Sequence, residues 1–323
     1  MENNNLIPEN EPGFDNNGKI FTTMSPVVAA FAAVIGIFLL YQFGGAILTL
    51  LIFGFDIEKA DVNAMRLLTI AGQILLMLLP TLLIARAVYQ ENISFALRVR
   101  FPKWKEVGIF TVGFIILLPL LQNFLYLQNY VIKFFAESSG TVKKVVEMLD
   151  SMDAIVEKSY LQLLTVNSVF EGLFVVILVA VTPAICEEAL FRGFVQKSFE
   201  QKYKPIYSIL ITSAFFGIYH FSPYGTIALI ALGIYFGYAA YKSDSIFVSM
   251  VLHFLNNFFA VIAFIIIGDE ELISAKATLD GGIAAPLVSL IVLSIVFIVF
   301  IFWVNRNYHS FINKGGENDL SKL

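Results

Sequence analysis

Long apolar runs alternate with short polar loops along most of this 323-residue chain. A helix of about 20 apolar residues crosses the ~30 Å hydrocarbon core of a bilayer. Inside that core, only helices and closed barrels can satisfy every backbone polar group. The pattern therefore predicts an all-α, polytopic membrane protein, a bundle of about eight transmembrane helices at residues 25–55, 67–88, 107–130, 161–199, 206–221, 227–241, 246–267 and 284–304.

Composition supports this interpretation, because 58% of the residues are hydrophobic, 14% are charged and the mean hydropathy is +0.78. A soluble domain of this length carries far more charge. No linker rich in Pro, Gly or Ser divides the chain. We expect a disordered cytoplasmic tail at 1–24, a single transmembrane domain at 25–304 with a catalytic core at about 160–270, and a cytoplasmic tail at 305–323.

Basic residues gather in alternate loops, which indicates orientation because Lys and Arg are retained on the cytoplasmic side. They lie after the predicted second, fourth and eighth helices, for example Arg98, Lys202 and Arg306. Both termini are therefore expected to be cytoplasmic in a multi-pass protein, which we expect in a bacterial plasma membrane. Residues 131–160 are expected to form an amphipathic helix on the outer interface. The net charge of −4 gives no support for nucleic-acid binding.

Three ionisable residues interrupt the end of the fourth apolar run: Glu187, Glu188 and Arg192. Each costs roughly 2.5–3.5 kcal/mol in a bilayer, so pairing, water access or function must offset the cost. Glu188 and Arg192 are four residues apart and share a helix face, whereas Glu187 is rotated by ~100°. Glu188 is expected to pair with Arg192 and to leave Glu187 free. The alternative is a structural salt bridge at the membrane edge.

Two of the three histidines also lie in apolar runs. His220 ends the fifth run, and His253 precedes Asn257 by one helical turn in the seventh. Asn256 is expected to face away from that pair and to serve packing. Counting residues from the adjoining turns places Glu187 and His220 level along their helices but His253 nearer the cytoplasm. The three residues therefore share one level only if the turn at 201–204 protrudes into the cytoplasm or the seventh helix starts deeper.

A carboxylate, two imidazoles and a carboxamide in a membrane cavity suit hydrolysis of a peptide bond. Glu187 would act as general base on a water that His220 orients, and His253 and Asn257 would donate hydrogen bonds to the oxyanion. Alternatively, Glu187, His220 and His253 would hold a divalent metal such as zinc, whose bound water attacks. The chain contains no His-Glu-x-x-His, Gly-x-Gly-Asp or Gly-x-Ser-x-Gly motif.

Glu-Glu-x-x-x-Arg, Phe-x-x-x-His and His-x-x-x-Asn, in this order on successive membrane helices, resemble the CPBP family. That family includes type II CAAX prenyl endopeptidases and the bacteriocin-processing or immunity proteins also called Abi. The resemblance covers about 160–270 and assigns Glu187, Glu188, Arg192, His220, His253 and Asn257 to the catalytic site. It implies an eight-helix bundle and a CAAX-protease-like intramembrane (metallo)endopeptidase. Its expected partners are the lipid bilayer and a membrane-embedded or lipid-anchored protein or peptide.

Two other functions fit the same residues. A non-enzymatic immunity protein would keep the site as a binding cavity for a bacteriocin or its receptor. A small proton-coupled transporter would use the buried ionisable residues as a relay, although the inverted repeats typical of transporters are not apparent.

Overall fold

The structure is a computed structural model that describes residues 20–55, 59–267, 279 and 282–313. Most of the expected N-terminal tail, the acidic loop after the seventh predicted helix and the last ten residues lie outside these ranges. Within the described part of the chain, all regular elements are helices. The predicted all-α fold is therefore confirmed.

Six of the helical segments are long and apolar enough to cross a membrane: Pro26–Phe53, Val62–Ala96, Trp104–Ser138, Val169–Glu200, Ile246–Ile267 and Ala284–Asn313. The other two predicted helices are α11 (Pro205–Tyr219), of 15 residues, and α12 (Thr226–Ser243), of 18 residues. Helix α11 is apolar but short, and α12 carries several Tyr and Gly residues as well as Lys242. A polytopic membrane protein is thus confirmed, and the expected number of eight spans is approximate.

Three of the six spans consist of several helical pieces. The first comprises α1 (Pro26–Leu39), η1 (Leu40–Gly44) and α2 (Gly45–Phe53), and the second comprises α3 (Val62–Gly72), η3 (Gln73–Leu78), α4 (Leu79–Tyr89), η4 (Gln90–Asn92) and α5 (Ile93–Ala96). The fourth comprises α8 (Val169–Val176), η5 (Ile177–Val181), α9 (Thr182–Glu188), η6 (Ala189–Val195) and α10 (Gln196–Glu200). The elements η1, η3, η5 and η6 are π-helical.

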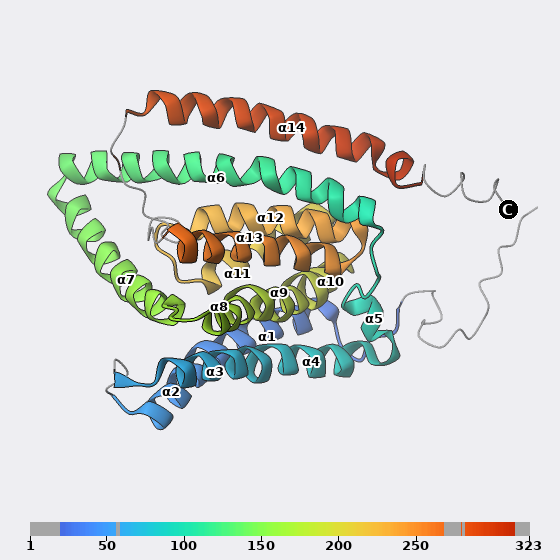
Figure 1. The fold of residues 1–323 in the computed structure, drawn as a ribbon. Helices are drawn as coiled ribbons and strands as arrows, with labels where there is room; N and C mark the ends of the chain where they lie inside the picture. Colours follow the sequence, from blue (N-terminus) through green and yellow to red (C-terminus); the bar gives the residue numbers. More distant parts are fainter. Residues whose placement is uncertain (1–19, 56–58, 268–278, 280–281, 314–323) are drawn as a thin grey trace, which may run out of the picture.

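The remaining helices are α6 (Trp104–Ser138), α7 (Gly140–Leu164), α13 (Ile246–Ile267) and α14 (Ala284–Asn313). Helices α6 and α14 lie side by side along one side of the molecule, and the first two spans form the opposite side (Figure 1). Between them, α11, α12 and α13 pack together, and α13 packs on α9 of the fourth span. The fourth span is therefore covered on both sides, with η3 and α1 on one and α12 and α13 on the other.

Local sequence signals explain where the helices around the centre begin. Ser168 caps α8 by accepting a hydrogen bond from the Glu171 backbone N–H, and the Glu171 side chain accepts one from the backbone N–H of Asn167, the residue before the cap. Pro205 occupies the first position of α11, where its missing N–H costs nothing. Helix α12 ends at Ser243 and is followed by the C-cap residue Asp244, which takes a left-handed conformation with φ 45°. These signals set the ends of the helices that carry the site.

Two outer helices differ from expectation in their extent. The expected amphipathic helix at 131–160 is divided at Ser139, because 131–138 continue α6 and only the remainder belongs to α7. The last helix, expected to end at residue 304, continues to Asn313. Most of this helix is exposed, since only 6% of its most apolar 18-residue stretch is buried. Such exposure suits contact with lipid.

Candidate functional site

The candidate site is built around the middle of the fourth span, where α9 passes into the π-helical η6. A π-helical turn breaks the regular bonding pattern of an α-helix, and such turns are frequent at functional sites. Glu187 and Glu188 are the last two residues of α9, and Arg192 lies within η6. All three side chains therefore lie on a span that is covered on both sides.

Glu188, Arg192 and His253 form a fully enclosed polar cluster. Arg192 Nη1 donates to Glu188 Oε1 at 2.7 Å, and both side chains are 0% exposed. Arg192 Nη2 donates to the Gly233 carbonyl oxygen at 3.2 Å, and the guanidinium lies 4.2 Å from the centre of the Phe216 ring. The expected pairing of Glu188 with Arg192 is present. A buried pair is stable only with such additional hydrogen bonds, because both charges have lost water.

His253 is held by the same carboxylate, since its Nδ1 lies 2.8 Å from Glu188 Oε1. Its ring packs between Phe236 and Phe216, at centroid distances of 5.7 and 5.9 Å. A carboxylate beside an arginine only accepts hydrogen bonds, so Nδ1 carries the proton. Nε2 of a neutral His253 is then an acceptor, and it becomes a donor only in the imidazolium.

Glu187 points away from this cluster and faces His220 instead. Glu187 Oε2 lies 3.7 Å from His220 Nε2, and the two side chains are 14% and 30% exposed, against 0% for Glu188. His220 Nδ1 lies 2.7 Å from the Phe216 carbonyl oxygen, which is an acceptor, so Nδ1 carries the proton here as well. Glu187 Oε2 is buried without a hydrogen-bond partner among the described residues. The more accessible carboxylate thus faces an imidazole lone pair.

Asn257 lies one turn beyond His253 and is fixed by two hydrogen bonds. Its Nδ2 donates to the Val179 carbonyl oxygen in η5 at 2.8 Å, and its Oδ1 accepts from Asn256 Nδ2 at 3.0 Å. Asn256 was expected to face away and serve only packing, but it orients the Asn257 amide. Asn257 Nδ2 carries a second hydrogen besides the one that it donates to Val179.

The depth mismatch expected for His253 is absent because the turn before α13 is recessed. Lys197 Nζ donates a hydrogen bond to Asp244 Oδ1 at 2.8 Å. The turn before α13 therefore lies beside Lys197, near the start of α10, rather than level with the turn that follows α10. Arg98 Nη1 also bonds Asp244 Oδ1, at 2.6 Å, while Arg98 Nε donates to the Arg192 carbonyl oxygen at 3.2 Å. Arg98 thereby links η6 to the start of α13. Glu188 and His253 consequently meet at one level.

Three tyrosines that sequence reasoning missed, Tyr41, Tyr160 and Tyr219, lie within electrostatic range of Glu187. Tyr219 precedes His220 and donates a hydrogen bond to the Val34 carbonyl oxygen of α1. Tyr41 and Tyr160 lie on the first span and on α7, far away in sequence, and neither belongs to a motif. Only the adjacency of Tyr219 to His220 offered a signal.

The predicted metal-ligand set does not converge in the described residues. Glu187 and His220 face each other, but His253 Nδ1 is committed to Glu188. No group of three His, Cys, Asp or Glu side chains suited to a metal occurs in the described part of the chain. A zinc ion at this site therefore stays a prediction.

Comparison with known proteins adds an independent line of support. Residues 169–259 match the family described as type II CAAX prenyl endopeptidase, Rce1-like. The match begins at the first residue of α8, ends within α13 and contains all six predicted site residues. No curated protein and no solved structure matches the chain. Residues 169–259 of this polytopic membrane protein therefore form an Rce1-like type II CAAX prenyl endopeptidase domain, which supports an intramembrane endopeptidase in general.

Proposed function

We propose that the protein hydrolyses a peptide bond in a membrane-embedded or lipid-anchored substrate, with Glu187 and His220 activating the attacking water. One observation carries this proposal: Glu187 Oε2 has no partner among the described residues and lies 3.7 Å from His220 Nε2. Both atoms are hydrogen-bond acceptors when His220 is neutral. A water satisfies both by donating one hydrogen to each, and its lone pairs then remain free to attack a carbonyl carbon.

The proposed reaction begins when the water oxygen bonds to the carbonyl carbon while its proton passes to the Glu187 carboxylate. Glu187 then returns this proton to the leaving nitrogen as the carbon–nitrogen bond breaks. The products are a carboxylic acid and an amine. The free hydrogen of Asn257 Nδ2 is the proposed donor to the oxyanion, since the Val179 and Asn256 contacts already orient the amide.

His253 and Glu188 have a separate proposed role. With Nδ1 bonded to Glu188, His253 can donate through Nε2 to the oxyanion only as an imidazolium. Glu188 supplies the counter-charge for such an imidazolium and also fixes the ring orientation. Glu188 is therefore proposed as a positioning residue, and Glu187 as the catalytic base. This division follows the difference in their exposure, which is 0% for Glu188 and 14% for Glu187.

The test compares the wild type with Glu187→Gln, in detergent, on a library of quenched peptides of which some carry a lipid. Loss of a general base is expected to lower kcat by about 10²–10⁴-fold. Glu91→Gln is the matched control, because that side chain is 77% exposed and lies outside the site. The same assay with an added metal chelator tests the predicted zinc. Loss of cleavage in the presence of the chelator would show that catalysis requires a metal.

Equal cleavage by the wild type and Glu187→Gln would remove the proposed role of Glu187. A second outcome would favour the immunity function instead. In that case neither protein cleaves any peptide, and cells that carry Glu187→Gln are still protected from a bacteriocin.

A further inference from the structure

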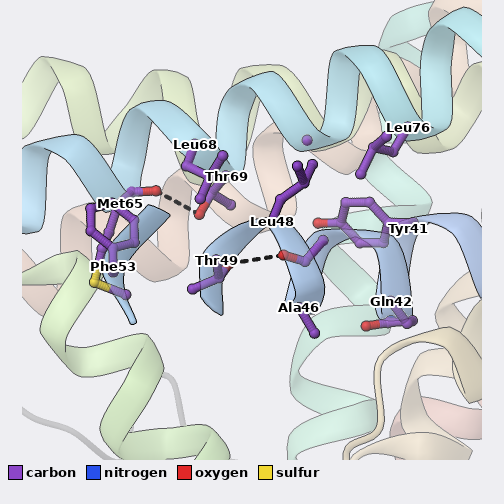
Figure 2. Close-up of a pocket in the computed structure, with 12 residues that line it drawn as sticks. Tyr41, Gln42, Ala46, Leu48, Thr49, Phe53, Met65, Leu68, Thr69 and Leu76 are labelled. Carbon is purple, nitrogen blue, oxygen red and sulfur yellow. Dashed lines mark hydrogen bonds between the residues drawn. The ribbon is translucent and has the colours of Figure 1, made fainter. Parts of the chain in front are cut away.

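Arg98 is a buried charge outside the candidate site. It lies on the loop between α5 and α6, outside residues 169–259, and belongs to none of the three sequence motifs. Its side chain is only 1% exposed. The groove between the first two spans, drawn in Figure 2, offers no comparable group, because its lining in the described part of the chain is uncharged. A buried guanidinium has lost its water, so the partners that replace the water indicate its role.

The Arg98 side chain joins three elements. Its Nε donates to the Arg192 carbonyl oxygen of η6 at 3.2 Å, and its Nη1 donates to Asp244 Oδ1, in the turn before α13, at 2.6 Å. Its Nη2 donates to Glu200 Oε2 at the end of α10. A guanidinium is a rigid, planar fork, so the directions of these three bonds are fixed relative to one another. Arg98 therefore fixes the turn before α13 against the fourth span.

The backbone of Arg98 also contacts α13. Its carbonyl oxygen accepts a hydrogen bond at 3.1 Å from the N–H of Ile246, the first residue of α13. The first N–H groups of a helix have no partner within the helix, and this bond satisfies one of them. Arg98 has φ 51°, a left-handed conformation that is unfavourable for a residue with a Cβ and persists only where surrounding contacts hold it. The side-chain and backbone bonds of Arg98 are such contacts.

The π-helical element η6 is suited to receive this loop. A Cβ added at Gly193 would lie 3.3 Å from Leu97 Cα, so glycine allows the loop to approach the helix closely. In a regular α-helix, the Gln196 N–H would bond the Arg192 carbonyl oxygen. Here it bonds the carbonyls on either side of that one. Arg98 Nε donates to the carbonyl that this pattern bypasses.

These contacts form a closed circuit through the candidate site. His253 lies two turns beyond Ile246, or ~10 Å along α13. Its Nδ1 lies 2.8 Å from Oε1 of Glu188, which itself pairs with Arg192 one turn further along the fourth span. Arg98 then joins Arg192 back to the start of α13. The depth of α13 at Arg98 therefore sets the distance between His253 and Glu188.

We propose that Arg98 is a positioning residue, which sets the depth of α13 against the fourth span and so holds His253 in hydrogen-bond contact with Glu188. This inference rests on the proposed endopeptidase function, and it adds a residue from outside the matched domain on which the geometry of the site depends. Arg98 acts on the reaction through His253. A displacement of about 1 Å at a catalytic group can lower a rate by about 10²-fold.

The test replaces Arg98 while keeping its charge. Arg98→Lys retains a cation for the two carboxylate partners but loses the fork that also reaches the Arg192 carbonyl. Arg66→Lys is the matched control, because Arg66 is also 1% exposed and also bonds a backbone carbonyl, that of Leu163, at 3.0 Å. Arg66 lies at the opposite end of the fourth span, with its Nη1 4.0 Å from Glu171 Oε2 of α8. Both variants therefore lose a buried arginine fork, but only one of them touches α13.

The kinetic measurement separates kcat from KM for folded protein in detergent. Arg98→Lys is expected to lower kcat by at least about tenfold and to change KM by less than about twofold, because the peptide still binds while His253 is displaced. Arg66→Lys is expected to leave kcat unchanged. If Arg98→Lys does not fold, Asp244→Asn breaks the same contact from a side chain that is 58% exposed, and kcat should fall there too. A kcat equal to that of Arg66→Lys would overturn the proposal.

A spectroscopic measurement separates failure of this proposal from failure of the proposed function. The chain holds three histidines, so nitrogen-15 labelling of histidine gives few NMR signals, and His253→Gln assigns the Nδ1–H signal of His253. This signal is expected to be lost in Arg98→Lys and kept in Arg66→Lys. Its loss in Arg98→Lys alone would support the positioning role even if no peptide is cleaved. An unchanged signal in Arg98→Lys would overturn that role even if the protein is an active endopeptidase.

Discussion

The buried pair of Glu188 and Arg192 makes a quantitative prediction about stability. Arg192→Met removes the guanidinium that donates to Glu188 Oε1 at 2.7 Å, while the unbranched methionine fills part of the space beside Phe216. Glu188 is 0% exposed, and His253 then remains as its ring-nitrogen partner at 2.8 Å. Removing one partner of a buried pair costs about 3–5 kcal/mol, because the other charge is left without compensation. We expect a loss of that size in the free energy of unfolding.

The double variant Arg192→Met/Glu188→Gln tests the reason for this loss. Replacing both members of a buried pair by uncharged groups of similar volume is often neutral. We therefore expect the double variant to lose less stability than Arg192→Met alone, with a large coupling in the double-mutant cycle. A glutamine at 188 can still hydrogen-bond His253, which keeps that ring in place.

The assay is a denaturant titration in detergent, followed by the fluorescence of Trp104 and Trp303. Arg86→Met is the matched control, because Arg86 pairs with Glu91 at 3.2 Å and both side chains are exposed, by 58% and 77%. Such a surface pair contributes ~0–1 kcal/mol. The reasoning is refuted if Arg192→Met costs no more than Arg86→Met, or if the double variant loses the sum of the two single losses.

Two further predictions concern helix packing and pH. Gly113→Ala on α6 should destabilise the protein by about 1–3 kcal/mol in the same titration, because its Cβ would collide with Tyr235 of α12 and Phe300 of α14, whereas Gly108→Ala meets no atom within 4 Å and should not. At Asp244, outside the spans, burial alone would raise the pKa, but Lys197 and Arg98 outweigh it and hold the pKa of the carboxyl below its ordinary 3.8. The stabilisation by the Asp244 carboxylate should therefore be complete above the ordinary pKa of 3.8 and should disappear as the pH falls through the lower pKa of the folded state. The difference in unfolding free energy between the wild type and Asp244→Asn should consequently shrink only in acid. A difference that is constant down to the lowest pH would contradict the ion pairs.

Apolar run lengths and local spacing allowed much of this protein to be predicted from sequence. The membrane spans follow from the length of each run, and the Glu188–Arg192 pair follows from four-residue spacing on one helix. The same spacing placed His253 and Asn257 on one face. Run length alone does not decide whether the two short helices α11 and α12 cross the bilayer, because their length and polarity lie at the limit for a span.

Which side chains pair across different helices could not be predicted from run length and spacing. Sequence reasoning grouped Glu187, His220 and His253, whereas His253 bonds Glu188 and Glu187 faces His220. The rotation and depth of each helix decide these partners. Both depend on contacts such as the one between Lys197 and Asp244, which brings the start of α13 level with the fourth span.

The sequence by itself determined that this is an all-helical membrane protein with three polar clusters in its apolar helices, because spans and one-helix faces depend on local spacing. Only the tertiary structure decided which carboxylate meets which histidine and that the turn before α13 lies beside Lys197. The physical reason is that lipid and protein interior are both apolar, so the pattern of hydrophobic residues in a membrane helix says little about which face meets protein. Packing and buried hydrogen bonds make that choice, and they join residues that are far apart in the chain.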